Sequence, residues 1–176
     1  MFPELVTNRY ILQQILPNDQ QFIFEGLSHP EVIRFYGVSF HSLESTEEQM
    51  QFYDTLIREG TGTWWKIVDR KTGEKIGAIG FNSFQPKHKK AEIGYWLLPA
   101  YWGGGIFAEV LPVVIDYLQS ELGVHRIEAL IEEGNERSGR ALKKAGFIHE
   151  GLLRDYEIKN GKFISLHMYA LIASSC

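Results

Sequence analysis

Three consecutive glycines, Gly103 to Gly105, lie between an apolar segment and a segment with helical periodicity. A glycine run at the start of a helix leaves backbone N–H groups unpaired, and the helix dipole adds positive potential at the same point. Glycine also lets a ligand approach the backbone closely and tolerates positive φ angles. The pattern predicts a site for phosphate or diphosphate, although a glycine triplet without its flanking segments is more often a simple turn.

A second strand-to-helix transition occurs at Asn135-Glu136-Arg137-Ser138. Asn135 is predicted to cap this helix, and Ser138 lies in its first turn. If the two transitions are neighbours, both side chains face the space beside the glycines, where α/β sheets bind ligands. The alternative is that Asn135 is only a cap and Ser138 an ordinary first-turn residue.

Strand and helix patterns alternate around these two transitions. Strands are predicted at residues 9–15, 63–69, 75–84, 91–98, 126–132, 148–158 and 162–173. Helices are predicted from Pro17 to Leu27, from Ser28 onward, and over residues 46–59, 105–118 and 135–145. This order predicts a mixed α/β fold with one central sheet, in a single domain spanning residues 1–176.

Several element ends have local signals. Ser28 is predicted as an N-cap, and Ser45 with Glu48 has the spacing of a capping box. Pro112, inside the glycine-initiated helix, is expected to kink it or to mark a wide turn. Asn160-Gly161 predicts a tight hairpin between the last two strands.

Composition excludes several classes of protein. The net charge of −4 gives no electrostatic basis for nucleic-acid binding, and no apolar run has the roughly 18 residues of a membrane span. The six histidines show no metal-ligand spacing, so no metal site is expected. The single cysteine, Cys176, and the absence of a signal-like N-terminus favour the cytoplasm.

The segments YWLLP, YWGGGIFAE and NERSGRALKKAGF, followed by a hairpin ending in MYAL, occur in a characteristic order. In this order and spacing the chain resembles the GCN5-related N-acetyltransferase (GNAT) family, and within it the RimJ/RimL-like branch of ribosomal-protein N-terminal acetyltransferases. The resemblance implies a twisted, mostly antiparallel sheet of about seven strands flanked by helices. It also implies a V-shaped cofactor slot between two central strands.

The resemblance assigns acetyl-CoA as co-substrate. The glycine-rich loop would bind its diphosphate, and the pantetheine arm would enter at a β-bulge at Leu97-Leu98. Asn135 would bond the cofactor arm. Arg137, Arg140 and Lys144 share a helix face that could meet the 3′-phosphate or could be only a solvated basic face. The implied cofactor residues are Leu97, Leu98, Gly103, Gly104, Gly105, Ile106, Phe107, Ala108, Asn135, Ser138 and Arg140.

The implied reaction is direct attack of a primary amine on the thioester, assisted by a carboxylate base. Glu157, before the Asn160-Gly161 turn, matches the base proposed for the RimL-like branch and is favoured. Glu92 lies on the central strand, where other acetyltransferases of this fold place theirs. Ser138 would protonate the leaving thiolate, and an N–H near Leu98 would stabilise the oxyanion.

The acceptor could be a protein N-terminus, ribosomal or other, or a small-molecule amine, and the protein could be a monomer or a homodimer. Trp102 stands where the loop motif of the family usually opens with Gln or Arg. Three further residues depart from the family pattern: Phe107 in the loop, Leu142 where relatives often have a tyrosine that acts as an acid, and Ser165 where they often have aspartate. These departures leave a second hypothesis open, that of an acetyl-CoA-binding module without turnover.

Overall fold

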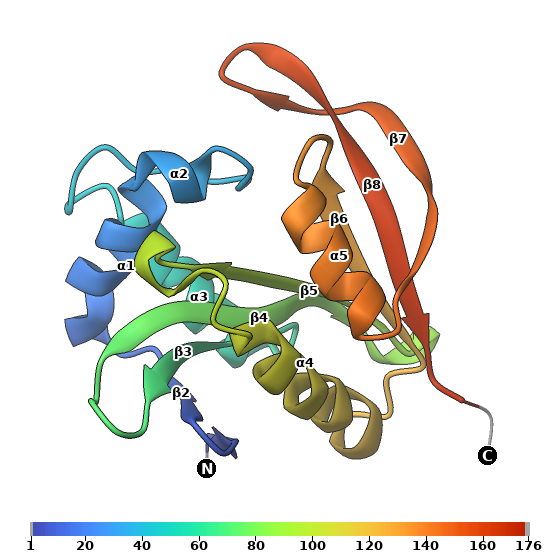
Figure 1. The fold of residues 1–176 in the computed structure, drawn as a ribbon, viewed down its shortest axis with the longest axis horizontal. Coiled ribbons are helices and arrows are strands. Elements are labelled where there is room, and N and C mark those ends of the chain that lie inside the picture. Colours follow the sequence, from blue (N-terminus) through green and yellow to red (C-terminus); the bar gives the residue numbers. More distant parts are fainter. Residues whose placement is uncertain (1, 175–176) are drawn as a thin grey trace.

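The computed structural model describes residues 2–174 and contains one twisted eight-stranded sheet with helices on both faces (Figure 1). The strand order is β1-β2-β3-β4-β5-β6-β8-β7. Only β5 and β6 run parallel; every other neighbouring pair is antiparallel. The predicted mixed α/β, mostly antiparallel fold is confirmed. None of the helices in the described part is both long and apolar enough to cross a membrane.

The eighth strand is one that sequence patterns did not indicate, the two-residue β1 that pairs with β2. The strands are β1 (Leu5–Val6), β2 (Tyr10–Gln14), β3 (Thr63–Asp69), β4 (Lys75–Gln85), β5 (Lys90–Leu97), β6 (Arg126–Glu132), β7 (Ile148–Lys159) and β8 (Lys162–Ile172). The helices are α1 (Gln20–Ser28), α2 (Pro30–Ile33), α3 (Glu47–Glu59), α4 (Ile106–Asp116) and α5 (Glu136–Lys144), and α4 continues into a π-helical turn over Tyr117–Glu121.

Adjacent tryptophans on β3 show how the two faces of the sheet are covered. Successive side chains of a strand point to opposite faces. Trp65 packs in the cluster that includes α4 and α5, whereas Trp64 packs against α1, α2 and α3. On β5, Tyr95 and Trp96 divide between the same two clusters. The helices α1–α3 therefore cover one face, and α4 and α5 cover the other.

The parallel strands β5 and β6 separate soon after they begin. They pair only from Lys90 to Glu92 on β5 and from Arg126 to Glu128 on β6. Beyond this point β5 remains paired with β4 and β6 with β8. The predicted V-shaped slot is thus present, and the elements that follow its two walls, α4 and α5, begin at its wide end (Figure 1).

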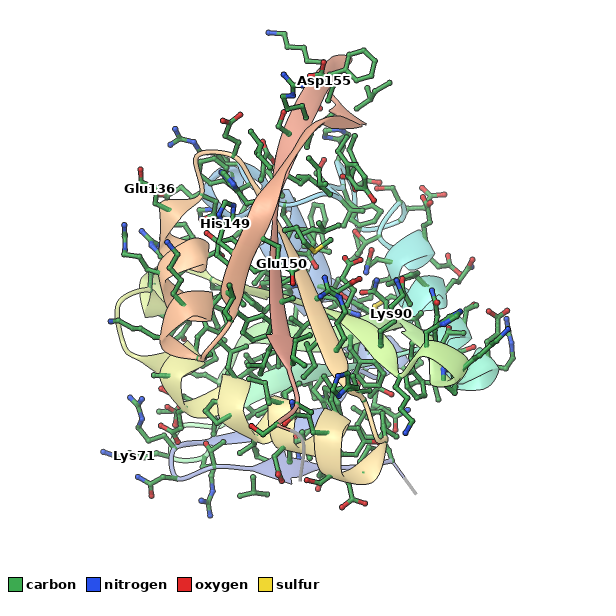
Figure 2. All side chains as sticks on the ribbon, turned by 90° about the vertical axis from the view of Figure 1, so that its right-hand side faces the viewer. Lys71, Lys90, Glu136, His149, Glu150 and Asp155 are labelled. Carbon is green, nitrogen blue, oxygen red and sulfur yellow. The ribbon has the colours of Figure 1, made fainter. Side chains whose placement is uncertain are left out.

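The antiparallel pair β7–β8 forms an arm that extends beyond the body. In Figure 2, Asp155 lies near the far end of this arm, whereas His149 and Glu150 lie closer to the body. The register shifts between Leu153 and Glu157, where Asp155 has φ of 50° and its N–H donates to Ser165 Oγ at 3.1 Å. The predicted Asn160-Gly161 turn is confirmed, with φ of 51° and 74°.

Three local predictions were wrong. Ser28 ends α1 and donates to the Phe24 carbonyl, while His29 caps α2 by accepting from the Glu31 N–H. Ser45 bonds to Ser42 and forms no capping box. The expected bulge at residues 97–98 is absent, because β5 stays in register with β4 through Gly77–Leu97. The irregularity lies on β4 instead, between Asn82 and Gln85.

Gly26 allows α1 to lie directly against Trp96. A Cβ at this position would come within 2.2 Å of the buried indole ring. Alanine is the better helix former by about 1 kcal/mol, but overpacking a core costs about 1–3 kcal/mol. We therefore expect Gly26→Ala to lower the free energy of unfolding, measured by urea denaturation. Gly37→Ala is the control, since a Cβ there meets nothing within 4 Å. Equal stability of the two variants would contradict this reading.

Candidate active site

A cavity of about 1250 Å³ occupies the opening between β5 and β6. Its walls come from β5, the glycine loop, α4, α5, the segment around α2, and the arm. Of the residues predicted for the site, Leu98 and Gly104 are not among those that line it. The predicted residues that do line it are Glu92, Leu97, Gly103, Gly105, Ile106, Phe107, Ala108, Asn135, Ser138, Arg140 and Glu157.

The glycine loop has a conformation suited to an anion. Gly103 and Gly105 have φ of 81° and 70°, a region that side chains disfavour, and a Cβ on Gly103 would project into open space. Gly105 is the N-cap of α4, so the first-turn amides of Ile106, Phe107 and Ala108 have no partner within the helix. These three residues line the cavity. The loop therefore offers several free donors at a positive helix end.

The backbone at the end of β5 divides its polar groups between two sides. Leu98 N–H donates to the Ile76 carbonyl on the β4 side at 2.9 Å, so it is not free to stabilise an oxyanion. In an antiparallel pair, every second residue of a strand directs its N–H and C=O groups toward the partner strand, and the residues between direct theirs to the opposite side. Leu97 and Tyr95 therefore direct theirs toward the opening left by β6. This corrects the assignment to Leu98 and supports the one to Leu97.

Trp102 replaces the polar residue that usually opens the loop motif, and it has a structural role. Its Nε1–H donates to the Leu97 carbonyl at 2.9 Å, which fixes the loop to the end of β5. The Arg137 guanidinium lies 4.1 Å from the centre of the same indole ring. Arg137 thereby joins α5 to the loop and places a cation at the cavity wall, next to Arg140 on the same helix.

Asn135 caps α5, and its Oδ1 accepts from the Ser138 N–H at 3.3 Å. Ser138 faces Tyr95, a residue that sequence reasoning missed because its strand position gives no catalytic signal. The Tyr95 hydroxyl is buried and forms no hydrogen bond within residues 2–174. Burial raises the pKa of Tyr95 to about 12, and the neighbouring Ser138 hydroxyl acts in the opposite direction. An uncompensated hydroxyl beside the cavity can donate to a developing anion.

The three further departures from the family pattern, Phe107, Leu142 and Ser165, also have structural explanations. Phe107 stacks on the Tyr95 ring with the ring centres 4.3 Å apart, while its backbone remains at the cavity wall. Leu142 is fully buried in the core beneath α5. Ser165 accepts from the Asp155 N–H and so stabilises the kink of the arm. None of them removes a cavity-lining backbone donor.

The two candidate bases differ in their surroundings. Glu92 is half-buried on β5, and its pKa is raised by burial and by the negative charges of Glu128 and Glu157. Glu128 is its partner on β6, held by Arg126 at 2.7 Å. Glu157 is exposed on the arm. The structure thus brings both candidates to one cavity, and Glu92 is the one whose protonation is favoured by its environment.

The match to known families decides the identity of this site. Residues 9–148 match the acetyltransferase (GNAT) domain model. The chain belongs to the GNAT acetyltransferase family. It is 41% identical to the uncharacterized N-acetyltransferase YoaA of Bacillus subtilis, over 98% of each chain. It is 29% identical to the ribosomal-protein-serine acetyltransferase of Escherichia coli, over 93% of this chain and 87% of that protein.

The same fold occurs in RimL, a ribosomal L7/L12 α-N-protein acetyltransferase solved with coenzyme A. That structure has a TM-score of 0.85 and 22% identity, with 96% of each chain covered. As a GNAT acetyltransferase, this protein transfers an acetyl group from acetyl-CoA to an amine. The free loop amides, the unpaired β5 edge and the cations of α5 fit an elongated anionic donor.

Tyr95→Phe tests the unpaired hydroxyl. Removing a buried group without a partner should leave the free energy of unfolding unchanged or raise it. Because the hydroxyl faces Ser138 at the cavity, we expect kcat to fall about tenfold, a modest loss for one donor. Coenzyme A affinity, measured by calorimetry, should stay the same.

The control for Tyr95→Phe is Tyr53→Phe, which removes another buried, unpartnered hydroxyl at a position that does not line the cavity. Its turnover should match that of the wild-type protein. Equal turnover of Tyr95→Phe and wild type would show that the Tyr95 hydroxyl has no part in the reaction.

Proposed function

We propose that this enzyme acetylates the N-terminal α-amine of a polypeptide. The observation that carries the proposal is the carboxylate-lined part of the cavity, where Glu92 and Glu157 face the space between the α2 segment and the arm. Residues of the α2 segment and of the arm line the cavity, and Figure 1 shows α2 and the arm at the same end of the molecule. In our proposal the chain that extends from the amine leaves along these two elements, beside the point where Lys159 Nζ donates to the Arg34 carbonyl at 2.7 Å. The names of two relatives, a ribosomal-protein-serine and a ribosomal L7/L12 acetyltransferase, agree with such an acceptor.

The chemistry of the amine supports the same choice. A free α-amine has a pKa of about 7.7–8.0, whereas a lysine-like amine has a pKa of about 10.4. A larger fraction of an α-amine is therefore already neutral near pH 7. A carboxylate with a raised pKa is sufficient to remove the proton that remains.

Acetyl-CoA supplies the activated acetyl group as a thioester. In our proposal the amides of Gly103 and Gly105 to Ala108 bind the diphosphate, and the N–H of Leu97, whose carbonyl is held by Trp102, binds the pantetheine arm. Asn135 contacts the same arm, and Arg137 and Arg140 lie toward the 3′-phosphate. These assignments are supported by the fact that all of these residues line the cavity.

We propose Glu92 as the base and Glu157 as the residue that attracts the ammonium form of the acceptor. The family resemblance favoured Glu157, but Glu92 is half-buried, and its pKa is raised by burial and by the charges of Glu128 and Glu157. Ser138, with Tyr95 beside it, donates to the sulfur as the thiolate leaves. We place the enzyme in the cytoplasm, since a single cysteine is typical of a reducing compartment.

An acceptor panel with a thiol-release assay tests the substrate class. We expect kcat/KM for short peptides beginning with serine or alanine to exceed that for spermidine or an amino-sugar by about tenfold or more, equal to about 1.4 kcal/mol of transition-state stabilisation. The same peptides with blocked N-termini are the control and should give no turnover. A preference for spermidine would replace this proposal by polyamine acetylation.

The pH dependence distinguishes the two glutamates. The base must be deprotonated, so kcat/KM should fall as the pH drops through the pKa of Glu92, which lies above its ordinary value. Glu92→Gln should lower kcat about 10²–10⁴-fold, as expected for loss of a general base. Glu157→Gln removes a neighbouring negative charge that raises the pKa of Glu92, so the acid limb should move to lower pH with most of kcat retained.

Glu59→Gln, a surface change at the end of α3 outside the cavity lining, is the control and should leave the profile unchanged. If Glu157→Gln abolished turnover while Glu92→Gln retained it, the two roles would be exchanged.

A further inference from the structure

The outer side of the glycine loop is in contact with an arginine from the first strands of the chain. Arg9, just before β2, donates from Nη1 to the Gly104 carbonyl at 3.1 Å and from Nη2 to the Gly105 carbonyl at 3.5 Å. Its Nε donates to Glu109 Oε2 at 2.7 Å, in the first turn of α4. We infer that Arg9 is a positioning residue, which orients the loop amides toward the diphosphate of the acetyl donor.

The planarity of the peptide bond connects these contacts to the ligand. In a trans peptide the C=O of one residue and the N–H of the next point in opposite directions. A carbonyl of Gly104 held by Arg9 therefore directs the Gly105 N–H to the other side of the loop. In the same way, the Gly105 carbonyl held by Arg9 directs the Ile106 N–H to that other side of the loop. Gly105 and Ile106 are residues that line the cavity.

The Gly104 carbonyl needs such a partner because it precedes the helix, whereas the Gly105 carbonyl, at the N-cap, also accepts the first hydrogen bond of α4. Gly105, the N-cap, is in the left-handed region with φ of 70°. Glycines at positions 103 to 105 allow many other backbone conformations, most of which would scatter the amide directions. An external donor that bonds two successive carbonyls selects one of these backbone conformations. The loop then loses its conformational entropy on folding, and little further entropy is lost when the ligand binds.

Arg9 also neutralises a charge that would oppose the ligand. Glu109 is an acidic residue in the first turn of the same helix whose amides would face the diphosphate. It accepts from the Arg9 N–H at 2.6 Å, from Arg9 Nε, and from Thr7 Oγ1 at 2.6 Å. Arg9 thus compensates the carboxylate and holds it on the β1–β2 side of α4. Without Arg9, Glu109 would be an unpaired negative charge near a bound anion.

The inference depends on the use of acetyl-CoA, and wild-type binding of coenzyme A tests that premise separately. For Arg9→Met we expect the Kd for coenzyme A, measured by calorimetry, and the KM for acetyl-CoA to rise about tenfold or more. S-acetylpantetheine, a donor without the diphosphate, should react with wild type and variant at equal kcat/KM. Arg9→Lys keeps the charge but can bond fewer carbonyls, so its Kd for coenzyme A should lie between those of the wild type and Arg9→Met.

Arg70→Met is the matched control. Arg70 is likewise exposed and bonds backbone carbonyls, those of Thr7 and Asn8, but it does not contact the glycine loop. Its Kd for coenzyme A should equal that of the wild type. Arg9→Met/Glu109→Gln should recover part of the affinity lost in Arg9→Met, because the uncompensated carboxylate is removed.

Two results would overturn the inference while leaving the function intact. One is an unchanged Kd for coenzyme A in both Arg9→Met and Arg9→Lys. The other is an equal loss with coenzyme A and with S-acetylpantetheine, which would indicate a general effect on folding. Failure of the wild-type protein to bind coenzyme A would instead contradict the donor assignment itself.

Discussion

The whole site depends on how briefly β5 and β6 are paired. Three residue pairs hold the strands together, and beyond Glu92 and Glu128 each strand keeps a partner on its outer side only. Alternate residues of β5, including Tyr95 and Leu97, are left with polar backbone groups that no strand satisfies. An extended ligand with amide groups can take the place of the missing strand. The divergence therefore creates both the cavity and the means of binding along it.

Charge is distributed unequally along this cavity. Arg137, Arg140 and Lys144 line it from α5, where Glu136 also lines the cavity and pairs with Arg140 at 3.3 Å. Glu92 and Glu157 line it from β5 and the arm. An anionic donor and a cationic acceptor are thus each matched by opposite charge, and they would meet where Ser138 and Tyr95 lie. The arrangement explains how a protein of modest net charge can attract two ligands of opposite sign.

Agreement between sequence and structure was good where a signal is local. The glycine loop, the Asn135 cap and the Asn160-Gly161 turn depend on backbone preferences of a few consecutive residues, and each is present. Predictions that needed a choice between equivalent local partners failed. Ser28 and His29 are both able to cap, and in the fold Ser28 donates to the Phe24 carbonyl of α1 while His29 caps α2. The bulge implied by the family resemblance at residues 97–98 is absent, because the pairing of β5 with β4 stays in register there.

The sequence by itself determined the mixed α/β fold and the position of the glycine loop, because periodicity and glycine spacing act over short stretches, and the order of its motifs carried the resemblance to the family. Only the tertiary structure decided which backbone groups of residues 95–98 are free, since that depends on pairing with β4. It also brought together residues distant in the chain, Arg9 with Gly104 and Tyr95 with Ser138. The difference between the two glutamates has the same origin: burial and neighbouring charge are properties of the folded cavity, and no spacing in the sequence encodes them.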